Sequence, residues 1–186
     1  MTKIIELIIK LLEKREANRK LVLDECVKPL QEQFDKIHAE YHEMFHRYRS
    51  ELKSNGVTET FNEGISSDLN TILTTRIKLA GDMKNLRIVS SAKIDAFDNM
   101  VNDLIQGILV YLNMSGIDHW EESGVIGRRN PTFERISFLV GSSGNDNDIT
   151  ALRRFLDFVI DDLHNNYNDV TDNFSVMKSF LLTGNS

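Results

Sequence analysis

Histidines at four-residue spacing are the residues of this chain whose pattern comes nearest to a site for chemistry. His38, His42 and His46 occur within the segment HAEYHEMFH. A spacing of four places successive side chains one helical turn apart on one face, so two imidazoles could share a divalent metal ion. Glu43 precedes His46 by three residues, which is the ligand spacing of di-iron helical bundles. The segment therefore raises the question of a metal centre.

The apolar residues around these histidines argue against a buried metal centre. They recur at alternating spacings of four and three, as the a and d positions of a heptad do: Leu23, Val27, Leu30, Phe34, Ile37, Tyr41, Met44 and Tyr48. In that frame His38 falls at e, His42 at b and His46 at f, so the histidines turn away from the apolar seam. We predict a solvated histidine face with no metal and no cofactor, and His42 and His46 are the weak candidates for an adventitious surface metal site.

Patterns that accompany catalysis are missing from the sequence. The chain has no glycine-rich phosphate loop, no G-x-S-x-G elbow and no His-Glu-x-x-His motif. Carboxylates such as Asp98 and Asp161 point off the apolar stripes of their segments, whereas catalytic carboxylates need burial or a close like charge. We therefore predict that the protein is not an enzyme and has no catalytic residues.

Composition limits the class of protein. With 186 residues, 41% hydrophobic and 27% charged, the chain is long enough for one globular domain. Its net charge of −6 argues against the wrapping of nucleic acid, which requires a cationic face. The single cysteine, Cys26, excludes an internal disulfide and indicates a reducing compartment. We expect a cytoplasmic protein that does not bind nucleic acid.

The first thirteen residues are strongly amphipathic. On a helical wheel, an arc of about 200° is filled by apolar residues: Ile4, Ile5, Leu7, Ile8, Ile9, Leu11 and Leu12. The rest of the wheel carries equal numbers of lysines and glutamates: Lys3, Lys10, Glu6 and Glu13. One interpretation is a helix buried on a wide face, inside the bundle or against a second subunit.

The same segment allows a second interpretation, a helix lying on a membrane surface. A basic run follows the apolar arc: Lys14, Arg15, Arg19 and Lys20. Such a run would be attracted to anionic lipid headgroups. The polar stripe within the helix contains as much glutamate as lysine, which favours burial instead.

Residues 21–54 carry the heptad pattern and predict one long helix. Pro29 removes a backbone hydrogen bond, so we expect a bend near residues 25–29. The sequence Ser54-Asn55-Gly56 predicts the end of the helix. Between residues 13 and 20 the heptad frame lapses, so the helix either breaks there or continues through solvent.

The remaining segments complete a single domain over residues 1–186. Residues 66–114 predict a helical pair, residues 115–148 a loop and a short helix or strand, and residues 149–182 helices that we expect at 149–166 and 171–182. Together with the amphipathic segment 1–20, these predict an all-α, antiparallel bundle of five to six helices with a long, bent N-terminal helix.

The aperiodic loop at residues 115–130 contains a second candidate for partner contact. It holds the only tryptophan, Trp120, and the pair Arg128 and Arg129. Trp and Arg are enriched at binding hot spots. The alternative is that Trp120 packs on the bundle and the arginines are solvated.

These observations favour an assembly function. A continuous helix of about 50 residues would be about 75 Å long, longer than the other predicted helices could cover. We therefore predict a non-enzymatic interaction or assembly protein that forms a homo-oligomer through its N-terminal helix. The expected interface is apolar: Ile4, Ile5, Ile8, Ile9 and Leu12. A peripheral membrane protein anchored by residues 1–20, or less favoured a helical metalloprotein, are the alternatives.

Overall fold

Six helical elements have bounds within the part of the chain that the structure describes, and most of the other described residues are helical as well. This computed structural model describes residues 2–13, 18–56, 58, 61, 63–65, 67–68, 78–79, 81–83, 86, 96–113 and 146–183. Its elements are α1 (Thr2–Glu13), α2 (Arg19–Val22), the π-helix η1 (Leu23–Val27), α3 (Lys28–Asn55), α5 (Ala96–Asn113) and α8 (Asp146–Thr183). None of the described residues is in a strand, and the prediction of an all-α protein is confirmed.

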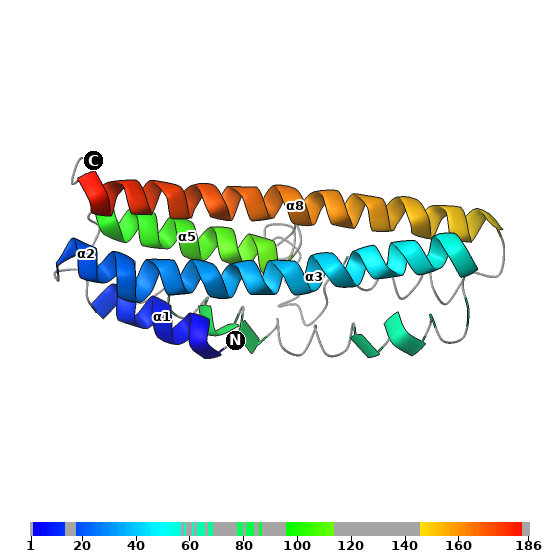
Figure 1. The fold of residues 1–186 in the computed structure, drawn as a ribbon, viewed down its shortest axis with the longest axis horizontal. Coiled ribbons are helices and arrows are strands. Elements are labelled where there is room, and N and C mark those ends of the chain that lie inside the picture. The colour runs from blue at the N-terminus through cyan, green and yellow to red at the C-terminus, as the bar shows by residue number, and fades with distance from the viewer. Residues whose placement is uncertain are drawn as a thin grey trace, which may run out of the picture.

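The helices lie side by side along one long axis (Figure 1). α2, η1 and α3 follow one another as a continuous rod, and α8 runs antiparallel to it. Arg49 pairs with Asp157 towards one end of the rod, and Asp35 accepts a hydrogen bond from Tyr167 further along. α5 lies against α8, and α1 turns back along the start of the rod.

Near Pro29, where the sequence predicts a bend, the rod contains the π-helix η1. Proline has no N–H to donate to the carbonyl four residues earlier, and its ring crowds that carbonyl. The backbone widens just before the proline, and the N–H of Lys28 donates to the carbonyl of Leu23, five residues back. At its other end the rod stops where the sequence predicts, because Gly56 adopts a positive φ of 69°.

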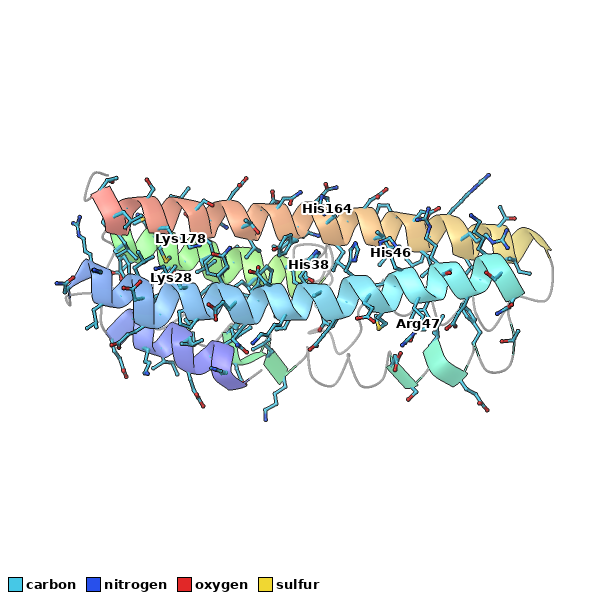
Figure 2. All side chains as sticks on the ribbon, in the orientation of Figure 1. Lys28, His38, His46, Arg47, His164 and Lys178 are labelled. Carbon is cyan, nitrogen blue, oxygen red and sulfur yellow. The ribbon has the colours of Figure 1, made fainter. Side chains whose placement is uncertain are left out.

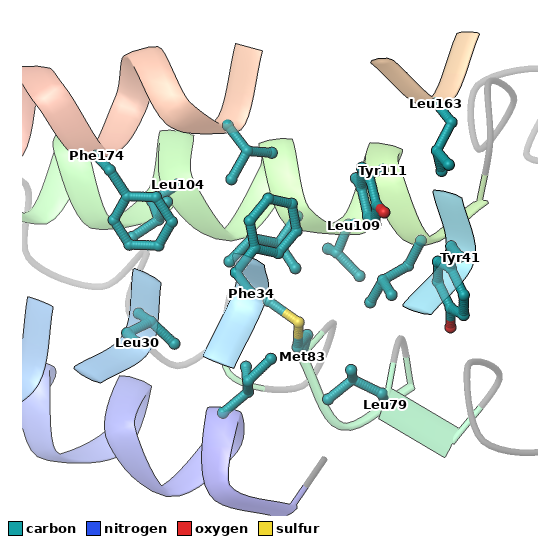
Figure 3. Close-up of a cluster of buried hydrophobic side chains, with 14 of the residues drawn as sticks. Leu30, Phe34, Tyr41, Leu79, Met83, Leu104, Leu109, Tyr111, Leu163 and Phe174 are labelled. Atoms are coloured by element: carbon teal, nitrogen blue, oxygen red, sulfur yellow. The ribbon is translucent and has the colours of Figure 1, made fainter. Parts of the chain in front are cut away.

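The heptad seam of the rod faces the core, as predicted. Seven of its eight residues are buried, and Ile37 is partly buried. The seam contacts more than one helix. Phe34 contacts Tyr111 of α5 edge-on, with ring centroids 4.7 Å apart, and stacks on Tyr167 of α8 at 5.8 Å. Figure 3 shows this cluster, in which Leu79 and Met83 also take part.

α8 corrects the prediction of two helices in residues 149–182. It is one unbroken helix of 38 residues. The polar sequence around Asn165 and Asn166 looks like a break, but Tyr167 and Val170 continue the apolar seam at a spacing of three. Because no proline or glycine interrupts this stretch, nothing in it stops the helix.

The expected overhang of the first helix is also wrong. The helix that begins at residue 2 ends at Glu13, and α1 lies alongside the rod rather than extending it. α8 is about 57 Å long, which is enough to run beside α3 and η1. At one end of the rod Arg153 donates to the carbonyl of Leu52, and at the other Arg19 lies 5.0 Å from the ring centre of Phe180.

α5 approaches α8 closely at Gly107. A Cβ atom at this position would lie 2.9 Å from Asn173 Nδ2 and 3.3 Å from a methyl group of Val170. Asn173 is held there because it donates to the carbonyl of Asp103 at 3.2 Å. The absence of a side chain at Gly107 therefore sets the spacing between the two helices.

We predict that Gly107→Leu lowers the free energy of unfolding by about 1–3 kcal/mol, because the larger side chain cannot fit between the helices. Gly81→Leu is the matched control. A Cβ at Gly81 meets no atom within 4 Å, so leucine should be neutral or stabilising by up to about 1 kcal/mol through helix propensity. Urea unfolding measures both, and equal effects would disprove the close approach.

Candidate functional site

His38 occupies a junction of three helices. Its Nδ1 lies 3.1 Å from the hydroxyl of Tyr111 of α5, and the two groups are hydrogen bonded. Its ring stacks on Tyr167 of α8, with centroids 3.8 Å apart and planes 12° apart. The hydroxyl of Tyr167 in turn donates to Asp35 at 3.0 Å. The prediction of a fully solvated histidine face is therefore wrong for His38.

His42 and His46 follow His38 at spacings of four along α3. His164 comes from α8, and Figure 2 labels it together with His38 and His46. The ring centres of His38 and His42 are 5.7 Å apart, and those of His42 and His46 are 4.2 Å apart. His42 is exposed and His46 is partly buried. We call these four residues, His38, His42, His46 and His164, the histidine cluster.

Metal binding by the histidine cluster finds no support in the geometry. Among the described residues, no group of three or more His, Cys, Asp or Glu side chains is placed to hold a metal ion. His42 and His46, the weak candidates from sequence, form at most a pair. A closed tetrahedral site requires four ligands.

The surroundings keep His38 uncharged. Burial, followed by like-charge repulsion from the neighbouring His42 and His164, lowers its pKa to about 4. The pKa of His46 is lowered as well, first by burial and then by His42 and Arg49. Uptake of protons here would place like charges together between α3 and α8.

This arrangement predicts that the protein is less stable in mild acid. Between pH 6.5 and about 4, His38 is protonated in the unfolded chain but neutral in the folded one. Stability is therefore full above pH 6.5 and falls as the pH drops towards 4. Because His38 is partly exposed, we expect its contribution to be on the order of 1 kcal/mol.

Urea unfolding of His38→Gln at pH 7 and pH 4.5 tests this, because glutamine retains hydrogen bonding but does not titrate. The variant should lose less stability on acidification than the wild type. The exposed His42→Gln is the control and should retain most of the wild-type loss. An unchanged loss in His38→Gln would contradict the assignment.

A second polar cluster joins residues 61–68 to α3. The hydroxyl of Tyr48 donates to Asp68, which also pairs with Arg47, and Phe61 packs edge-on against Tyr48 at 6.0 Å. Burial and the adjacent carboxylate raise the pKa of Tyr48. This phenol stays protonated at neutral pH and acts as a hydrogen-bond donor that holds the segment in place.

The apolar arc of α1 is divided into two parts. Ile4 and Ile8, two of the five predicted interface residues, are buried by the chain itself, together with Leu7 and Leu11. These four residues pack against the rod, to which α1 makes its contacts. A position in the core removes Ile4 and Ile8 from any surface that a partner could reach.

The other three predicted interface residues form a separate stripe. Ile5, Ile9 and Leu12 have spacings of four and three, so they lie along one flank of α1. Ile9 is 38% exposed, and Ile5 and Leu12 are partly buried. We call these three residues the outer stripe of α1.

Charged residues border the outer stripe on the side away from the core. Lys3, Glu6, Lys10 and Glu13 are all exposed. In the part of the chain that the structure describes, no hydrogen bond or ion pair involves any of their side chains. We call these four residues the charged flank of α1, and its charges are free to meet a partner.

The predicted partner loop with Trp120, Arg128 and Arg129 lies outside the described residues. Among the helices that are described, none combines the length and apolar character needed to cross a bilayer.

Comparison of the chain with protein-family models, curated proteins and solved structures found no match. Its function therefore has to be inferred from its own surface and chemistry.

Proposed function

We propose that the protein is a non-enzymatic helical assembly protein that self-associates through α1. The observation that carries this proposal is the outer stripe. Ile9 is exposed between two partly buried apolar neighbours, on a helix whose opposite side is anchored in the core. An apolar stripe on an anchored helix is a surface that a second helix can cover with little loss of conformational entropy.

A second copy suits this surface better than a lipid bilayer does. The charged flank contains as many glutamates as lysines, so it has no net attraction for anionic headgroups. Two copies of such a flank can instead neutralise each other. The anchor in the core also takes up Ile4 and Ile8, which a membrane-surface helix would need for insertion.

The association should be weak and dependent on concentration. α1 has 12 residues and is about 18 Å long. A contact of this length buries less than the roughly 1,200 Å² of a standard stable interface.

We place the protein in the cytoplasm, because its only cysteine, Cys26, is buried and forms no disulfide.

We predict that Ile9→Glu abolishes self-association, because it places a charge in the centre of the outer stripe. Light scattering over a concentration series should show the wild-type mass rising above the 21.3 kDa of one chain. The variant should remain at the mass of one chain, with an unchanged circular dichroism spectrum.

Phe158→Glu is the matched control for this experiment. Phe158 is an apolar residue of α8 that is 55% exposed, so the substitution has the same chemistry at another surface. It should leave the concentration dependence intact. A wild-type mass of one chain at every concentration would disprove the proposed function, and association that appears only with lipid vesicles would favour the membrane alternative.

A further inference from the structure

The order of charges along α1 has a symmetry of its own. Lys3 and Glu13 are equally distant from residue 8, and so are Glu6 and Lys10. In both pairs the two members carry opposite charges. Reversing the direction of the helix about residue 8 therefore exchanges each lysine with a glutamate.

All four charges lie on the same side of the outer stripe. Taking 100° per residue around the helix, the charged flank occupies an arc of about 80°, next to Ile9. The buried residues Ile4, Leu7, Ile8 and Leu11 occupy a separate arc of about 100° on the other side of the outer stripe. A helix that covers the outer stripe would meet the charged flank along one edge only.

An antiparallel pair related by a two-fold axis brings each flank against the same flank of its mate. With the axis at the height of residue 8, Lys3 of one copy would face Glu13 of the other, and Glu6 would face Lys10. Every charge on the flank is then level with an opposite charge of the mate along the helix axis. Residue Ile9 lies close to the axis, where the two outer stripes would meet.

A parallel arrangement lacks this match. Its two-fold axis runs along the helices and brings the charged flank of one copy against the opposite flank of the other. The lysines and glutamates of one copy would then lie away from the charged flank of the other. Exposed ion pairs contribute only about 0–1 kcal/mol each, but a mismatch of several charges selects between orientations.

We propose that the occupant of the outer stripe is α1 of a second copy in antiparallel, two-fold orientation, with the charged flanks setting direction and register. This inference rests on the proposed self-association. It names the partner surface, the orientation of the pair and the residues that specify it. The apolar stripe supplies the attraction, and the charges supply the selectivity.

Two variants with flanks of a single sign test the pairing. Lys3→Glu with Lys10→Glu makes the flank entirely acidic, and Glu6→Lys with Glu13→Lys makes it entirely basic. Each variant alone should repel its own copies, and its dissociation constant should rise about tenfold or more. An equimolar mixture should form one-to-one heterodimers with near wild-type affinity. Sedimentation velocity, with one variant fluorescently labelled, measures both effects.

The matched control is Asp161→Lys with Asp169→Lys, which changes the net charge as much as the basic variant does but on exposed positions of α8. It should dimerise like the wild type. Formation of the heterodimer itself shows that both single-sign variants are folded. The substitutions Glu6→Lys and Lys10→Glu, made singly, should give smaller effects of the same sign.

The outcomes separate the two proposals. Selective heterodimers support antiparallel pairing. If the wild type dimerises but the single-sign variants dimerise equally well and show no preference for each other, the pairing proposed here is overturned while self-association stands. A wild type that stays a single chain at all concentrations overturns both.

Discussion

Burial of the apolar seam on the rod formed by η1 and α3 is the constraint on which the rest of this structure depends. The seam extends from Leu23 to Tyr48, and no single neighbouring helix covers all of it. α8 runs along it, α5 covers part of it through Tyr111, and α1 folds back over its beginning. Each of these helices must therefore present its own apolar side to the rod. That requirement determines which side chains are left for the surface.

In α1, the need to bury apolar side chains against the rod decides which residues remain exposed. The rod covers only part of its apolar arc, so Ile4 and Ile8 are in the core while Ile9 stays exposed. The remaining stripe is too narrow to mark an obligate interface, but it is bordered by charges whose order is self-complementary. The histidine cluster follows from the same packing, because Tyr111 and Tyr167 meet His38 only where α5 and α8 both reach the rod. The proposed assembly and the predicted acid sensitivity would thus both follow from how the seam is covered.

Local patterns in the sequence predict where helices begin and end better than they predict how the helices contact one another. The heptad of α3, the distortion at Pro29 and the stop at Gly56 are all set by residues close in the chain. The continuity of α8 was missed because Tyr167 and Val170 lie within a polar stretch, although their spacing continues the seam. The environment of His38 depends on Tyr111, 73 residues away, which periodicity cannot reveal. The predicted overhang is wrong because it assumes one helix through α1 and α2, whereas α1 packs alongside the rod.

The distance between two copies of a spin label on α1 tests the central claim most directly. Labels are attached to Glu6→Cys or to Glu13→Cys, each in a chain whose buried Cys26 is replaced by alanine, and at a protein concentration high enough to offset the loss of one charge of the flank. Antiparallel pairing about residue 8 predicts an axial separation of about 6 Å at residue 6 and about 15 Å at residue 13. The labels at residue 6 should therefore couple more strongly than those at residue 13. Equal coupling at the two positions, or none at either, would contradict the claim.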